Sequence, residues 1–228
     1  GVLSKVAQGN GSTGTSVVLI TPDAERTMNT HLGMCREYNV KDIDEKLLIS
    51  SSFLYFTGYM WDTESQKEAI QKAVDIARSN NIKICFDVAD PFVVERNRED
   101  FFEFIKNNVD IVFANQPELF ILFQSKDINQ SIDSLMHIVN CGAVKLGKKG
   151  SIVFNNLEKN DIEPKLILAK DTTGAGDMYA AGFLSQFFKT NDYIASGKIG
   201  SALAEEIVQI NGAQFDKKKM SQIRSNIF

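Results

Sequence analysis

The sequence predicts an α/β protein, in which a mostly parallel sheet lies between two layers of helices and is preceded by a small β lid. From about residue 50 onward, short apolar segments alternate with longer amphipathic segments. This alternation indicates a parallel sheet that is covered by helices on both faces. Residues 15–32 lie outside the alternation and read as two strands. We therefore divide the chain into a partial β lid with its linker, residues 1–36, and an α/β core, residues 37–228.

The lid is predicted as a β-hairpin. Residues 15–21 are rich in β-branched and apolar side chains, and residues 26–31 alternate in the manner of a strand. Between them, Pro-Asp-Ala at 22–24 supplies typical turn chemistry. We expect this hairpin to form a flap or a small second sheet.

The core elements follow in order. In the helix expected over residues 63–80, Ala69, Ile70, Ala73 and Val74 mark one apolar face. The other expected helices cover 92–107, 116–124, 128–139, 175–189, 192–210 and 217–226. The expected strands cover 53–57, 82–87, 110–114, 143–146 and 151–154. Crossovers between the parallel strands should be right-handed.

Composition excludes several classes of function. The net charge of −4 disfavours a nucleic-acid partner, and no apolar run is long enough to span a membrane. Three widely spaced cysteines form neither a disulfide framework nor a zinc pattern. A reducing cytoplasm is the simplest location for such a chain.

The most informative segment is residues 171–177, which read Asp-Thr-Thr-Gly-Ala-Gly-Asp and run into a helix of small residues. Gly174 and Gly176 allow backbone conformations in which successive amides point into one concavity. The helix that follows adds the partial positive charge of its first turn, which favours phosphate oxygens. Asp177 at the same helix start is placed to accept a proton from a hydroxyl. This combination is what phosphoryl transfer to an alcohol needs.

Residues 171–183 resemble the carboxy-terminal signature of the ribokinase (PfkB) kinases, which implies a ribokinase-like fold. The resemblance implies that Asp177 is the catalytic base and that the amides of Gly174, Ala175 and Gly176 hold the transferred phosphoryl group. It also places Thr172 near the nucleotide phosphates. On this basis residues 37–228 are expected to be a nucleotide-binding and catalytic core.

Two further segments resemble motifs of the same family. Residues 115–118, Asn-Gln-Pro-Glu, resemble its Asn-x-x-Glu motif, which assigns Asn115 to the nucleotide site and Glu118 to Mg²⁺ through water. Residues 145–150 resemble the segment along the nucleotide, with Lys145 where the family usually has Thr or Ser. From this segment Lys145 and Gly147 are assigned to nucleotide binding. A solvated basic turn and a proline-started helix are the structural alternatives.

Residues 211–213 match the region where the family closes over adenine, which assigns Gly212 to the nucleotide. Close helix packing is the alternative for those small residues. Asp87 and Asp90 follow a strand at the edge where ligands collect in open α/β sheets, although Asp90 with the proline after it can equally start a helix.

Residues 21–33 and 59–62 resemble bacterial adenosine kinases and carbohydrate kinases. The resemblance implies an ATP-dependent kinase that uses Mg²⁺, and it admits a monovalent cation such as K⁺. Adenosine is the leading acceptor, and a ribose-type or fructose-type sugar is the alternative. In the lid, Arg26 and Asn29 are candidates to contact this substrate, with ordinary flap surface as the alternative. The exposed hairpin edge allows a homodimer through the lid.

Family members carry a preceding section, with the first sheet strands and a substrate-holding Asp, that this sequence lacks. We therefore expect the intact protein to be a kinase and this chain alone to be weakly active or inactive. A nucleotide-binding remnant with a role in protein interaction is the non-enzymatic alternative.

Other enzyme classes are poorly supported. Residues 9–14 satisfy a dinucleotide-binding fingerprint, but a strand rather than a helix is predicted after them. No segment fits the Walker motif of P-loop nucleotidases or the signatures of protein kinases. The sequence lacks the Gly-x-Ser-x-Gly elbow of serine hydrolases, and it has two histidines, His31 and His137.

Overall fold

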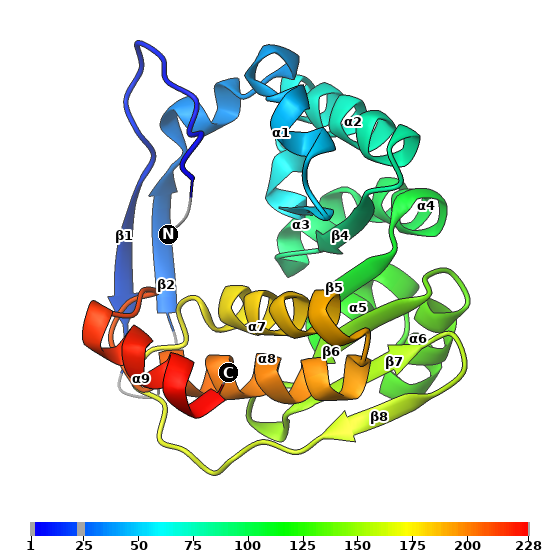
Figure 1. Cartoon of the computed structure of the whole chain (residues 1–228), viewed down its shortest axis with the longest axis vertical. Coiled ribbons are helices and arrows are strands. Elements are labelled where there is room, and N and C mark those ends of the chain that lie inside the picture. Colours follow the sequence, from blue (N-terminus) through cyan, green and yellow to red (C-terminus); the bar gives the residue numbers. More distant parts are fainter. Residues whose placement is uncertain (1–2, 22–25, 228) are drawn as a thin grey trace.

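The computed structural model describes residues 3–21 and 26–227, with the side chain of Arg26 outside this description. Figure 1 shows the arrangement. The strands are β1 (Thr15–Ile20), β2 (Arg26–His31), β3 (Phe53–Thr57), β4 (Lys83–Asp87), β5 (Ile111–Asn115), β6 (Cys141–Lys145), β7 (Ser151–Asn155) and β8 (Lys159–Ile162). The α-helices are α1 (Glu45–Ile49), α2 (Glu64–Ser79), α3 (Pro91–Arg96), α4 (Arg98–Asn108), α5 (Gln116–Phe123), α6 (Ile128–Met136), α7 (Ala175–Thr190), α8 (Tyr193–Ile207) and α9 (Lys217–Ile227). Short 3₁₀ helices are η1 (Gly33–Glu37), η2 (Val40–Asp42), η3 (Gly58–Trp61) and η4 (Gly147–Lys149).

The predicted α/β class is confirmed. Among the described residues, one sheet has the strand order β3-β4-β5-β6-β7-β8. The pairs from β3 to β6 are parallel, and β7 and β8 add antiparallel pairs. The sheet is therefore mixed, with its parallel strands delivering their carboxyl ends to one edge, where ligands bind in such folds.

The two faces of the sheet carry separate apolar cores because side chains alternate along each strand. On β5, Val112 and Ala114 belong to the core beneath α2, α4, α5 and α6. Ile111 and Phe113 belong to the core beneath α7 and α8. Helices α7 and α8 pack side by side over this second face (Figure 1). The three-layer arrangement predicted from the sequence follows from this alternation.

The predicted hairpin is also confirmed. Strands β1 and β2 pair antiparallel, with Thr15 opposite His31, and they stand beside the core as a separate two-stranded sheet (Figure 1). A cleft of about 2140 Å³ lies between the hairpin and the core. It is lined by Met28 and Thr30 of β2 and by Tyr55 of β3.

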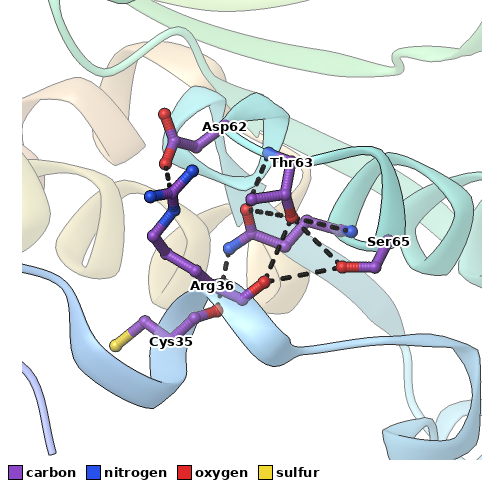
Figure 2. Close-up of polar contacts among 6 residues, drawn as sticks. Cys35, Arg36, Asp62, Thr63 and Ser65 are labelled. Carbon is purple, nitrogen blue, oxygen red and sulfur yellow. Dashed lines mark hydrogen bonds and ion pairs between the residues drawn. The ribbon is translucent and has the colours of Figure 1, made fainter.

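The hairpin is joined to the core by polar contacts between η1 and the start of α2 (Figure 2). The Gln66 side-chain amide donates to the carbonyl of Cys35 at 2.9 Å, and the Thr63 hydroxyl donates to the carbonyl of Arg36 at 3.2 Å. Arg36 also forms an ion pair with Asp62 at 3.2 Å. Because Thr63 and Gln66 form the capping box of α2, the residues that start this helix also hold the base of the lid.

Three features differ from the sequence prediction. The helix expected over 92–107 is two helices, because the Asn97 side chain donates to the carbonyl of Val93 at 2.9 Å and competes with the backbone there. Strand β8 and helix α1 were not predicted, since β8 is polar and α1 has only one buried side chain, Leu48.

In the part of the chain that the structure describes, no helix has the length and apolarity needed to cross a membrane.

Candidate active site

The start of α7 holds residues 174–177, for which the sequence predicts an anion cradle. Gly174 precedes the helix with φ of +78°, in the left-handed region that favours glycine. A Cβ atom built there would lie 2.8 Å from the Cβ of Ala213, so the position excludes larger residues. The first intrahelical bond runs from the Met178 amide to the Gly174 carbonyl at 2.9 Å. The amides of the first turn have no carbonyl within the helix to bind, and with the helix dipole they favour an anion.

Asp171 braces the loop that leads into this helix. Its carboxylate is buried and accepts hydrogen bonds from the amide and hydroxyl of Thr173, at 2.9 and 2.6 Å. The other oxygen accepts from the amide of Gly212 at 2.7 Å. One buried carboxylate thus ties the cradle to the segment assigned to adenine, 41 residues further along the chain. Asp171 is part of the predicted motif, but its contacts to Thr173 and Gly212 were not predicted from the sequence.

Lys145 lies against the cradle, at the carboxyl end of β6. Its ammonium forms an ion pair with Asp87 of β4 at 2.7 Å. A Cβ on Gly176 would lie 3.3 Å from the same ammonium nitrogen. Burial lowers the pKa of Lys145, but the carboxylates of Asp87, Glu118 and Asp177 outweigh it and hold this pKa above its usual range. The amine is therefore charged.

Glu118 lies in the first turn of α5, and only 1% of its surface is exposed. Its two carboxylate oxygens accept from the backbone amide and the side-chain amide of Asn115, each at 2.6 Å. The Glu118 amide donates back to the Asn115 side chain at 2.9 Å. Burial raises the pKa of Glu118 to about 7, although the ammonium of Lys145 opposes the rise. Asn115 itself pairs in register with Lys145.

Tyr55 of β3 adds a residue that sequence reasoning missed. Its ring packs edge-on against Phe113 at 6.4 Å. Among the described residues its hydroxyl is buried and has no hydrogen-bond partner. Burial, followed by the charges of Asp87 and Asp177, raises its pKa, so the phenol is neutral. An apolar strand gives no signal of this kind, because an ordinary core tyrosine has the same sequence context.

The structure therefore brings together the cradle residues 174–176, Asp177, Lys145 and Glu118 at the carboxyl edge of the sheet. Thr172 lies in the loop, where its carbonyl accepts from the Ala175 amide at 3.3 Å. Gly147 is exposed in a surface turn two residues after Lys145, with φ of +59°.

Of the two lid candidates, the structure describes the side chain of Asn29 but not that of Arg26. Asn29 is exposed on β2, between Met28 and Thr30, which line the cleft. For Arg26, only the backbone is described, as the first residue of β2, and the predicted contact of its side chain falls outside the described residues. Both assignments stay predictions.

The acidic side chains suit a magnesium ion that brings most of its own ligands. Among the described residues, no three His, Cys, Asp or Glu side chains form a metal cage. Glu118 supplies one carboxylate, and its oxygens, though each accepts one hydrogen bond, keep a further lone pair. Mg²⁺ bound to phosphates retains several waters and needs only one or two such carboxylates. The chemistry of the donor set is thus compatible with Mg²⁺ carried by a nucleotide.

Comparison with known proteins identifies the family. Residues 3–220 match the profile described as pfkB family carbohydrate kinase. The chain is 24% identical over 215 residues to an uncharacterized sugar kinase of Archaeoglobus fulgidus, which covers 92% of this chain and 82% of that protein. It is 24% identical over 201 residues to a 5-dehydro-2-deoxygluconokinase of Clostridium beijerinckii, covering 84% of this chain and 59% of that protein.

Solved structures agree. The adenosine kinase of Sinorhizobium meliloti superposes with a TM-score of 0.89 at 32% identity, covering 93% of this chain and 66% of that one. The fold alone is shared with a putative ribokinase II of E. coli solved with ATP and Mg²⁺, with a TM-score of 0.79, 19% identity, and coverage of 93% and 71%. The chain thus spans about three fifths to two thirds of several matched kinases. It belongs to the pfkB family of carbohydrate kinases.

Proposed function

We propose that this protein transfers the γ-phosphoryl group of ATP to a hydroxyl of a small nucleoside or sugar, with adenosine as the leading acceptor. The observation that carries the proposal is the start of α7, where Asp177 lies in the first turn of a helix that follows the left-handed Gly174. Lys145 adds a charged ammonium to the same place. An anion cradle beside a carboxylate is the arrangement that phosphoryl transfer to an alcohol requires.

In the proposed reaction, the substrate hydroxyl oxygen forms a bond to the γ-phosphorus as the bond from that phosphorus to the bridging oxygen breaks. The electron pair of the broken bond leaves with ADP, and the hydroxyl proton passes to Asp177. The amides of Gly174, Ala175 and Gly176 hold the transferred phosphoryl group by the partial positive charge of the helix start. Mg²⁺ bound to the nucleotide would neutralise part of the phosphate charge.

The remaining residues are assigned to binding. Asn115, Lys145, Gly147, Thr172 and Gly212 flank the nucleotide in the proposal. Glu118 holds Mg²⁺ through water with its one carboxylate, whose two oxygens each accept a hydrogen bond from Asn115. Arg26 and Asn29 contact the acceptor from the lid, and closure of the lid over the acceptor would exclude water.

Adenosine is favoured by the 32% identity and close superposition with an adenosine kinase. The alternative is a sugar, favoured by the two curated sugar kinases to which the chain is similar. A panel of adenosine, ribose, fructose and 5-dehydro-2-deoxygluconate, read by ADP release, separates these acceptors. Running the panel in K⁺ and in Na⁺ tests the monovalent cation at the same time.

The Asp177→Asn variant tests the chemistry. Loss of a positioned base lowers turnover by about 10²–10⁴-fold, while the affinity for ATP is retained. Asp161→Asn is the matched control, because Asp161 is exposed on β8 and its variant should keep full turnover. Full activity in Asp177→Asn would refute the assignment of the base.

We also propose a homodimer through the lid. All six residues of β1 are exposed, and they include the apolar side chains Val17 and Leu19 at 66% and 63% exposure. Met28 of β2 is 49% exposed. A two-stranded sheet whose β1 strand exposes apolar side chains is a surface that a second copy can pair with. Sedimentation of the protein and of a Val17→Lys/Leu19→Lys variant tests this, and a monomeric parent protein would refute it.

A further inference from the structure

The buried ion pair between Lys145 and Asp87 lies directly beside the cradle at the start of α7. Asp87 is the last residue of β4, and Lys145 is the last residue of β6. Strand β5 lies between them in the sheet, so the ion pair bridges over the end of a whole strand. The two residues are 58 positions apart in the sequence and meet at 2.7 Å.

The pair faces α7. Along β4, Asp87 alternates with Phe86 and lies on the same side as Cys85, which belongs to the core beneath α7 and α8. The side chains of Asp87 and Lys145 are only 6% and 17% exposed. A flexible surface lysine would sample many positions, whereas this one is held in a single place.

Asp87 is itself fixed. One carboxylate oxygen accepts a hydrogen bond from the ammonium of Lys145, and the other accepts one from the Ala89 amide at 3.1 Å. Ala89 has φ of +77°, an uncommon conformation for a residue with a side chain. The turn after β4 thus adopts a costly backbone conformation that aims an amide at Asp87. Both oxygens of the anchor are therefore engaged within the protein.

The Lys145 ammonium also lies close to the backbone of α7 at Gly176. A Cβ on residue 176 would lie 3.3 Å from the Lys145 nitrogen, which is closer than most side-chain contacts. Glycine at 176 leaves the space between the ammonium and the first turn of the helix open. A phosphoryl group in the cradle would then lie against both the helix amides and a full positive charge.

We propose that the Lys145 ammonium neutralises the phosphoryl group that is being transferred, and that Asp87 is the positioning residue that holds the ammonium in the cradle. This inference rests on the proposed function, since it assigns a role within the same site. It goes beyond nucleotide binding in two ways. It gives Lys145 contact with the terminal phosphate rather than with the nucleotide in general, and it makes Asp87 act only through Lys145.

The test measures equilibrium affinity for ATP and for ADP, which requires no turnover. Lys145→Met keeps most of the side-chain stem and removes the charge. Because the ammonium faces the terminal phosphate, this variant should lose about tenfold or more in affinity for ATP, and much less for ADP. Asp87→Asn should show the same selective loss, because the ammonium is no longer held beside the cradle.

A double variant separates positioning from independent action. If Asp87 acts through Lys145, adding Asp87→Asn to Lys145→Met should change the ratio of ATP to ADP affinity no further. Asp110→Asn is the matched control. Asp110, the residue before β5, pairs at 3.2 Å with Lys83, the first residue of β4. This pair lies at the end of β4 opposite to Asp87, so the Asp110→Asn variant should keep the parent ratio of affinities.

The outcomes are distinct. Equal losses for ATP and ADP in Lys145→Met, or additive effects in the double variant, would overturn the inference and leave the proposed function standing. A parent protein that binds neither nucleotide would instead defeat the proposed function and the inference with it. If Asp87→Asn does not fold, Asp87→Glu replaces it. This variant keeps the charge but shifts the carboxylate by one methylene, so a smaller selective loss of ATP affinity is expected, and an unchanged ratio of ATP to ADP affinity would count against positioning by Asp87.

Discussion

The buried carboxylate of Glu118 makes the stability of this protein depend on pH in an unusual direction. Glu118 is 1% exposed, and burial raises its pKa from 4.5 to about 7. Below pH 4.5 the carboxyl is protonated in both the folded and the unfolded chain. As the pH rises toward 7, the unfolded chain releases its proton while the folded chain retains it, so the free energy of unfolding falls.

The magnitude follows from the two pKa values. The difference between 4.5 and about 7, at about 1.36 kcal/mol for each pH unit, amounts to about 3 kcal/mol. This stability is fully present below pH 4.5 and is lost by the time the pH has passed 7. It is a large fraction of the about 5–15 kcal/mol that holds an ordinary domain together.

Glu118→Gln removes the titration. The neutral amide cannot accept both hydrogen bonds from Asn115, so the variant should lose about 1 kcal/mol at pH 4.5, where the parent carboxyl is also neutral. At pH 8 the parent carries the full cost of its buried charge, and the variant should then be the more stable of the two.

The assay is urea unfolding between pH 4.5 and 8, followed by circular dichroism. The difference in unfolding free energy between variant and parent should move by about 3 kcal/mol in favour of the variant over this range. Glu68→Gln is the control, because Glu68 is exposed on α2 and its difference should stay constant. A constant difference for Glu118→Gln as well would show that Glu118 is ionised throughout, and would refute the reasoning.

Three further predictions concern the cradle, β3 and the base of the lid. Gly174→Ala should lower the free energy of unfolding by about 2–3 kcal/mol, because the new side chain is strained at φ of +78° and overlaps Ala213. Gly147→Ala also has a positive φ but open space around it, so it should lower this free energy by only about 1 kcal/mol. Equal losses of the two variants in thermal melts would contradict the overlap. Tyr55→Phe removes a buried hydroxyl that has no partner among the described residues, so urea unfolding should show stability unchanged or raised by about 1 kcal/mol; a clear loss would show that the hydroxyl is bonded. Gln66→Ala should destabilise by about 1–2 kcal/mol, because it removes a buried contact to η1 and half of a capping box. Asp62→Ala, which removes a half-exposed ion pair, should cost under about 1 kcal/mol, and the reverse order in denaturant midpoints would show that the ion pair holds the lid base.

Local chemistry explains why the start of α7 could be predicted from the sequence. A glycine in the left-handed region, and first-turn amides that have no carbonyl partner within the helix, depend on a few neighbouring residues. The spacing of apolar residues likewise predicted α2, and the alternation of apolar strands with amphipathic helices predicted a sheet covered on both faces. The break at Asn97 was not predicted, because the spacing of apolar residues does not reveal a side-chain hydrogen bond such as that from Asn97 to the Val93 carbonyl.

The sequence by itself determined the α/β class, the hairpin, and the start of α7 with Gly174 and Asp177, since each is written in consecutive residues. Only the tertiary structure decided which distant side chains meet there. Asp87 meets Lys145 across 58 residues, and Asp171 meets Gly212 across 41. The physical reason is that sheet order and helix packing set these encounters, and burial then fixes their charges: it brings the pKa of Glu118 close to neutral and surrounds one ammonium with three carboxylates.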